Sequence, residues 1–198
     1  MQAEIEVKFT DIEIDDMRKR LEKAGAHLEQ PMRLMRRVNI EQPHHQEAGA
    51  WIRIRDEGDK VTMTYKAGMK KQHAIDRLQE LEVTVSDFDT TVEIFKAAGW
   101  PPKTYQESKR ETWKLGDGEI VIDEWPWLAP MVEIEAKDAD AVRALAEALS
   151  FNWNDAEYGN IDDVYMHHYN FIKDFRGVID LETVRFGDPV PQEFGERK

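Results

Sequence analysis

Charged side chains recur at every second position in several short segments of this chain. Glu4, Glu6 and Lys8 alternate with apolar residues near the start, and Glu133 and Glu135 repeat the pattern much later. A β-strand points successive side chains to opposite faces, so each segment would carry a row of charges on one face. Paired carboxylates of this kind are suited to a hard divalent cation, although a single charged strand face is more often simply solvated.

The segments between these two carry arginines, lysines and further carboxylates with the same alternation. The additional candidate site residues are Arg37, Arg53, Arg55, Lys66, Glu80, Glu82, Arg110 and Asp123. Guanidinium groups bind phosphate oxygens in pairs, and ammonium groups bind them as point charges. A site that joins these cations to several carboxylates is therefore suited to Mg²⁺ or Mn²⁺ together with a chain of phosphates.

The alternating segments predict eight β-strands, mostly joined as hairpins. The strands are expected over residues 3–9, 34–41, 51–55, 61–66, 78–85, 103–113, 119–124 and 131–136. Polar, glycine-containing turns at 56–59 and 116–118 join neighbouring strands. Apolar spacing predicts helices over 11–25, from Asp87 or Asp89 toward Gly99, from Asp138 or Asp140 through Leu149, and over 161–171.

The fold class predicted from these elements is α+β, an eight-stranded antiparallel β-barrel flanked by helices. The charged faces would line its lumen, where acids and bases nearly balance, because an unpaired buried charge is costly. The apolar faces would pack outward against the helices. We expect a barrel domain over 1–150 and a helical extension or tail over 151–198. The helix that begins at Ile161 could close one mouth of the lumen or pack on the exterior.

Composition narrows the class of protein. The chain has 198 residues, of which 41% are hydrophobic, and a formal net charge of -13. Such an acidic chain is unsuited to general binding of nucleic acid or anionic membrane. It contains no cysteine and no apolar run of membrane-spanning length, and it does not begin with the basic and then apolar segments of a signal peptide. We therefore expect a cytoplasmic protein with a small-molecule substrate. The sequence leaves monomer and homodimer open, and we expect His44 and His45 to be solvated.

The order of these motifs resembles the CYTH domain, whose members are also called triphosphate tunnel metalloenzymes. The carrying motifs are the opening Glu-x-Glu-x-Lys, Arg-x-Arg, Thr-x-Lys, an internal Glu-x-Glu, an arginine strand, an aspartate strand and the closing Glu-x-Glu, over residues 2 to about 150. The family includes thiamine triphosphatases, inorganic triphosphatases and class IV adenylate cyclases. Two positions depart from its pattern: Ser108 replaces the lysine of a Lys-x-Arg pair, and Ala129 replaces a usual glycine.

The resemblance implies a role for each candidate residue. Glu4, Glu6, Glu133 and Glu135 would hold metal, and Glu80, Glu82 and Asp123 would ligate a second metal or orient basic residues. The phosphate-binding set would be Lys8, Arg37, Arg53, Arg55, Lys66 and Arg110. Glu4, Glu6, Lys8, Glu133 and Glu135 would be catalytic. Arg37 is preferred to Arg36 because it shares a face with Asn39 and Glu41, and Lys109 should point away from the lumen.

The function implied by the resemblance is metal-dependent hydrolysis of a triphosphate, with Mg²⁺ or Mn²⁺ as the cofactor. The substrate would be inorganic tripolyphosphate, thiamine triphosphate or a nucleoside triphosphate. A class IV adenylate cyclase, which converts ATP to cyclic AMP and pyrophosphate, is the alternative because it would use the same residues. A polyphosphate- or nucleotide-binding protein without turnover is the third reading.

Overall fold

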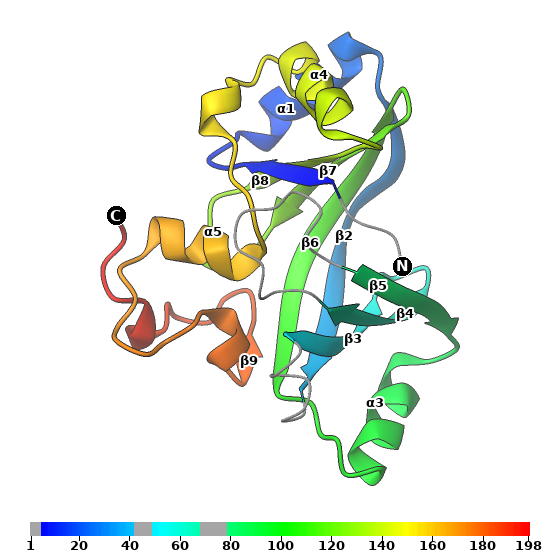
Figure 1. The fold of residues 1–198 in the computed structure, drawn as a ribbon, viewed down its shortest axis with the longest axis vertical. Helices are drawn as coiled ribbons and strands as arrows, with labels where there is room; N and C mark the ends of the chain where they lie inside the picture. Colours follow the sequence, from blue (N-terminus) through cyan, green and yellow to red (C-terminus); the bar gives the residue numbers. More distant parts are fainter. Residues whose placement is uncertain (1–4, 42–48, 68–78) are drawn as a thin grey trace.

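In a computed structural model, which describes residues 5–41, 49–67 and 79–198, the strands form one curved sheet (Figure 1). The strands are β1 Glu6–Phe9, β2 His27–Ile40, β3 Ala50–Asp56, β4 Val61–Ala67, β5 Gln79–Val85, β6 Thr104–Leu115, β7 Gly118–Glu124, β8 Met131–Glu135 and β9 Thr183–Val184. The α-helices in the described ranges are α1 Ile14–Ala24, α3 Phe88–Ala97, α4 Ala139–Ala148 and α5 Ile161–His168. Short 3-10 helices are η1 Trp153–Asp155, η2 Val178–Asp180 and η3 Gln192–Phe194.

The strand order is β1-β8-β7-β6-β2-β3-β4-β5, and every neighbouring pair along this path is antiparallel. The long strands β2 and β6 form the spine of the sheet in Figure 1. Strand β2 begins at His27, earlier than predicted, because residues from His27 onward pair with β6 through two register shifts. The ninth strand, β9, was not predicted and pairs in parallel with β6.

The predicted closure of the sheet into a barrel is wrong. Within the described ranges, β1 pairs with β8 and β5 pairs with β4, but no pairing joins β1 to β5. The outer edge of β1 is taken by the tail instead: Lys8 N–H donates to Glu157 O and Glu157 N–H donates to Lys8 O, both at 2.9 Å. A strand edge can pair with only one partner at a time, so this bridge stands where a closing strand would have to bind.

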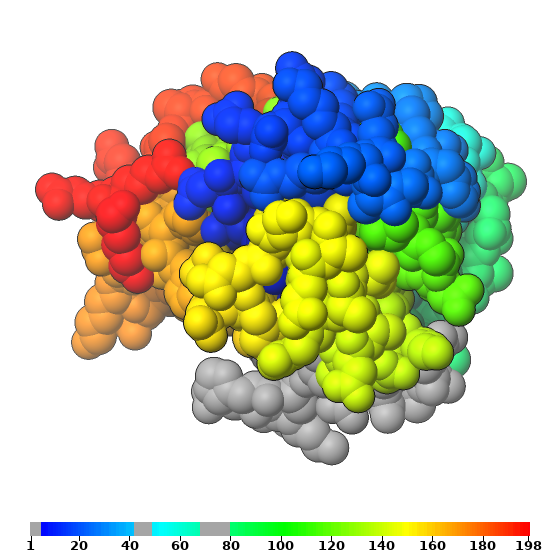
Figure 2. Space-filling view, turned by 90° about the horizontal axis from the view of Figure 1, so that it is seen from above, coloured from blue at the N-terminus to red at the C-terminus, as the bar shows by residue number. Residues whose placement is uncertain are grey.

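Helices α1 and α4 cover the outer face of the sheet at β1, β7 and β8. Seen from above in Figure 2, the blue segment that contains α1 lies beside the yellow segment that contains α4. Val7 and Phe9 pack there against Leu21 of α1 and Val142 of α4, and all four are buried. The charged residues that alternate with Val7 and Phe9 point to the other side of the sheet. The prediction of apolar faces toward helices and charged faces toward the interior is thus confirmed for this half.

The other half of the sheet packs against α3. Asp87 begins this helix by accepting a hydrogen bond from Thr90 N–H at 2.6 Å, which satisfies one of the free amides of the first turn. Phe88 and Val92 of α3 bury the outward face of β2 and β3. Arg36 also lies outside, where it pairs with Asp56 at 2.9 Å.

The tail after residue 150 packs against the loop between β7 and β8. Its core gathers Tyr165, Tyr169 and Phe194 around Trp125 and Met131. The division at residue 150 stays a prediction, but this packing gives the tail an extensive apolar contact with the sheet. In the part of the chain that the structure describes, no helix has the length and hydropathy of a membrane span.

Candidate functional site: a cavity lined by acids and bases

The concave side of the sheet encloses a cavity of about 350 Å³. Its wall includes almost every site residue that the sequence predicts, namely Glu6, Lys8, Arg37, Arg53, Arg55, Lys66, Glu80, Glu82, Arg110, Asp123, Glu133 and Glu135. The remaining candidate, Glu4, lies outside the described residues, as do His44 and His45. The structure therefore brings the predicted charges to one place, while the role of each remains a prediction.

Lys8, Glu133 and Arg110 form a buried ion-pair chain across β1, β8 and β6. Glu133 Oε1 lies 3.4 Å from Lys8 Nζ, and Glu133 Oε2 lies 2.7 Å from Arg110 Nη2. Burial alone would raise the pKa of Glu133, but Lys8 and Arg110 outweigh it and lower this pKa to about 2. Burial opposes the charge of Lys8 as well, yet Glu133 and Glu6 raise the pKa of Lys8. Both groups are therefore charged at neutral pH.

Asp123 on β7 meets the same arginine. Arg110 Nε donates to Asp123 Oδ1 at 2.7 Å, and Arg110 Nη2 also pairs with the second oxygen. Burial raises the pKa of Asp123 while Arg110 opposes that rise, so the pair forms despite a desolvation cost. Arg110 is thereby fixed by two carboxylates in a forked geometry that leaves part of its guanidinium facing the cavity.

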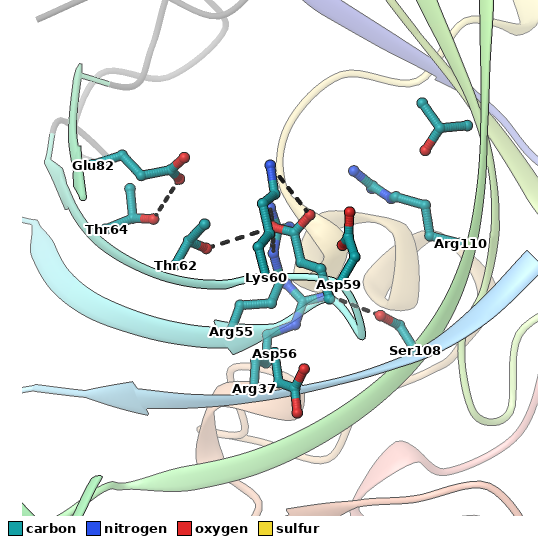
Figure 3. Close-up of polar contacts among 12 residues, drawn as sticks. Arg37, Arg55, Asp56, Asp59, Lys60, Thr62, Thr64, Glu82, Ser108 and Arg110 are labelled. Atoms are coloured by element: carbon teal, nitrogen blue, oxygen red, sulfur yellow. Dashed lines mark hydrogen bonds and ion pairs between the residues drawn. The ribbon is translucent and has the colours of Figure 1, made fainter. Parts of the chain in front are cut away.

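Arg37 differs from these residues, because within the described ranges it forms no ion pair with a carboxylate. Its Nη2 donates to the Ser108 hydroxyl at 3.3 Å (Figure 3), and its Cζ lies 4.3 Å from the centroid of the Trp125 ring. Burial and the neighbouring positive charges of Arg53, Arg55 and Arg110 lower the pKa of Arg37 well below its usual value. Arg37 therefore lies beside three other guanidinium groups and has no carboxylate ion pair of its own within the described ranges, which is an arrangement that favours a bound anion.

The wall formed by β3, β4 and β5 contains paired charges. Arg55 pairs with Glu57 at 2.8 Å, and Lys66 forms an ion pair with Glu80. Thr64 donates to Glu82 at 2.8 Å, as Figure 3 shows. Glu57 was predicted only as part of a hairpin turn, yet it is buried, and Arg55 and Lys60 outweigh that burial and lower its pKa. No sequence pattern indicates this role, because a turn residue lies outside the strand alternation.

The start of α5 forms another part of the wall. Gly159, Asn160, Ile161 and Asp162 line the cavity, together with Ile179 from η2. Lys8 Nζ donates to Gly159 O at 3.0 Å, and Asp162 Oδ1 accepts from Ile179 N–H at 3.3 Å. Burial raises the pKa of Asp162 to about 7. The sequence left open whether this helix closes one mouth of the lumen or packs on the exterior. In the structure its first turn lies at the cavity.

Besides these residues of α5 and η2, further wall residues on the sheet and the loop after β7 were not in the predicted site set. They are Asn39, Glu41, Trp51, Gln106, Glu119, Val121 and Trp125. All except Trp125 alternate in phase with a predicted site residue on the same strand, so strict extension of the pattern would have found them. Trp125 lies in a loop and has no such signal. Lys109 points away from the cavity as predicted, toward Glu124 at 3.5 Å.

The carboxylates supply the oxygen donors that a hard divalent cation prefers. Glu6 and Glu135 are paired in register across β1 and β8, next to Lys8 and Glu133. Among residues 5–41, 49–67 and 79–198, no three acidic or histidine side chains gather as a ready metal centre. Glu133 instead pairs with Lys8, and Asp123 pairs with Arg110. The carboxylate oxygens are therefore of the kind that fits a metal ion, and basic side chains occupy them in this structure.

Fold and cavity together define an α+β protein in which a curved antiparallel sheet surrounds a polar site rich in arginine and carboxylate. The chain belongs to the CYTH domain family, whose model matches residues 2–164. The match includes the first turn of α5 as well as all eight strands of the main path.

Solved structures share this fold. A protein from Pyrococcus horikoshii is similar with 24% identity and a TM-score of 0.63, over 78% of this chain and 94% of that chain. A Hippeastrum adenylyl-cyclase candidate, described as having a dominant triphosphatase activity, is similar with 12% identity and a TM-score of 0.53, over 81% of this chain and 91% of its own. No curated protein matches the chain.

Proposed function

We propose that this protein binds a triphosphate in the charged cavity and hydrolyses it with a divalent metal ion, Mg²⁺ or Mn²⁺. The observation that carries the proposal is Arg37. Its guanidinium lies among three other arginines, and within the described ranges it has no carboxylate ion pair. Neighbouring positive charges repel one another, so an incoming polyanion would relieve the repulsion among these groups.

The cations are arranged to contact a chain of phosphates along several strands. Arg37 comes from β2, Arg53 and Arg55 from β3, Lys66 from β4 and Arg110 from β6, so oxygens of successive phosphates would each meet a different donor. Fixed positive groups also stabilise negative charge that develops on phosphoryl oxygens during transfer. The ion pairs of Arg55 and Arg110 fix their guanidinium planes before substrate arrives.

Glu6, Glu133 and Glu135 are the described carboxylates best placed to hold the metal, with Glu4 added by the family pattern. A bound divalent ion would neutralise phosphate charge and activate water as a Lewis acid. Lys8 lies between Glu6 and Glu133 and, together with Arg110, lowers the pKa of Glu133 to about 2, so Glu133 is in the ionised form that binds a cation. The apolar core under α1 and α4 lies on the other face of the sheet, and most residues of the cavity wall are polar or charged.

A substrate panel tests the proposal. Tripolyphosphate, thiamine triphosphate and ATP are each incubated with Mg²⁺ and with Mn²⁺, and orthophosphate, pyrophosphate and cyclic AMP are measured. We expect orthophosphate from at least one substrate. The described activity of the Hippeastrum protein supports this expectation, although its low identity relates it to this chain by fold alone.

Arg37→Ala is the decisive variant, with Lys109→Ala as its matched control. Losing one charged hydrogen-bond donor to phosphate is expected to lower kcat/KM by about 10- to 100-fold. Lys109→Ala should leave kcat/KM unchanged because Lys109 faces away from the cavity, toward Phe186 and Glu124. Full activity of Arg37→Ala would refute the assignment of the site. Cyclic AMP as the main product would favour the cyclase, and tight binding without turnover would favour a sensor.

A further inference from the structure

We propose that the Trp125–Trp127 loop and the tail behind it position Arg37 for phosphate binding. This inference rests on the proposed function, since it concerns how the same cavity holds its phosphate-binding arginine. The loop joins β7 to β8 and carries the sequence Trp-Pro-Trp. Nothing in the strand alternation marks it as part of a site.

The contact between the loop and the cavity is the Trp125 ring. Trp125 is 4% exposed, and Arg37 Cζ lies 4.3 Å from the centroid of its ring. A guanidinium at this distance from an indole face is attracted by the ring quadrupole. Ser108 supplies the second contact, a hydrogen bond of 3.3 Å. Arg37 is therefore held by an aromatic ring and a neutral hydroxyl.

The nature of these partners matters for binding. A carboxylate partner would fix the guanidinium but would also offset its charge, as Glu57 does for Arg55. The ring of Trp125 restricts Arg37 while leaving its positive charge available to an anion. Arg37 is thus oriented without a carboxylate ion pair of its own within the described ranges, which is the condition that favours capture of phosphate oxygens.

The tail fixes the loop through three hydrogen bonds to its backbone or ring. Tyr165 Oη donates to Pro126 O at 2.6 Å, Tyr169 Oη donates to Trp127 O at 2.5 Å, and Trp127 Nε1 donates to Asp188 O at 2.7 Å. Trp127 has a φ of 67°, a left-handed conformation that is unfavourable for a tryptophan and needs such support. The path of contacts therefore runs from the tail, through the loop, to the Trp125 ring and Arg37.

A double-mutant cycle on the full chain tests the inference, with tripolyphosphate binding measured by calorimetry in chelator and repeated with Mg²⁺. Trp125→Leu is expected to weaken binding about tenfold when Arg37 is present. In the Arg37→Ala background the same change should have less than a twofold effect, because its target is gone. Trp125→Phe keeps an aromatic face and should restore most of the affinity.

The tail arm of the inference is tested with Tyr165→Phe, which removes only the hydroxyl that donates to Pro126. We expect about a threefold loss of affinity that disappears when Arg37 is alanine. Tyr158→Phe, at an exposed tyrosine, is the matched control and should change nothing. If Trp125→Leu fails to fold, Tyr165→Phe and Trp125→Phe decide the matter alone.

The outcomes separate this inference from the proposed function. Equal effects of the Trp125 or Tyr165 changes with and without Arg37 would overturn the inference, while binding by the unaltered protein would leave the function standing. No binding of tripolyphosphate by the unaltered protein, with or without Mg²⁺, would overturn the proposed function and this inference with it.

Discussion

Replacing Asp162 by asparagine should change how the stability of the protein depends on pH. Asp162 is in the first turn of α5, where its Oδ1 accepts the Ile179 N–H, and burial raises its pKa from 3.8 to about 7. Asp163 and Asp180 raise the pKa further, whereas the Ile179 and Val178 amides oppose the rise. Asparagine keeps the acceptor oxygen for Ile179 but cannot ionise.

The sign follows from proton binding. Between pH 4 and pH 7 the folded state keeps a proton on Asp162 that the unfolded chain has released, so stability falls as pH rises through this window. For a pKa of 3.8 in the unfolded state and about 7 in the folded state, the loss between pH 5 and pH 8 is about 2–3 kcal/mol, at 1.36 kcal/mol per pKa unit. This is an upper limit, because the side chain borders the cavity and its solvent.

The assay is urea unfolding of the unaltered protein and Asp162→Asn at several values between pH 5 and pH 8. The variant should gain stability relative to the unaltered protein as pH rises, and the difference should level off above pH 7. Asp188→Asn removes the same charge from an exposed position in the tail and controls for the high net negative charge. Parallel pH profiles for the unaltered protein and Asp162→Asn would show that this reasoning is wrong.

Three further predictions concern the fold and the cofactor. Glu111→Gln should lower the free energy of unfolding by about 1–3 kcal/mol, because buried Glu111 accepts from Arg18 at 2.7 Å, yet tripolyphosphate binding should be unchanged in calorimetry. Gly177→Ala should lower the thermal stability more than Gly187→Ala. Both glycines have positive φ, but a Cβ at residue 177 would lie 2.3 Å from Asp162 Oδ1, whereas a Cβ at residue 187 would meet open space. Equal losses of stability would contradict this crowding. Chelation of divalent metal should abolish phosphate release without changing the circular dichroism, and Mg²⁺ or Mn²⁺ should restore it; chelator-resistant hydrolysis would exclude the proposed metal requirement.

The sequence was sufficient to predict which side chains share a face. Alternation along β3 assigned Arg53 and Arg55 to the interior, and the phase of β2 separated Arg37 from Arg36 correctly. These assignments depend only on the two-residue period of a strand, which is a local property of the backbone. The N-terminal caps of α3 and α4 also depend on local sequence. Asp87 and Asp138 each accept a hydrogen bond from the backbone N–H three residues further along the chain.

Tertiary structure alone decided how the sheet ends and what surrounds Arg37. Glu157 pairs with the edge of β1 across a separation of 149 residues in the chain. No local sequence pattern indicates which distant segment will pair with a strand edge. The same holds for Trp125 and the buried Glu57, whose positions come from loop and turn geometry, and for Asp162, whose position comes from the packing of α5. Periodicity fixes the direction of a side chain within an element, whereas the partner that meets it depends on how separate elements pack.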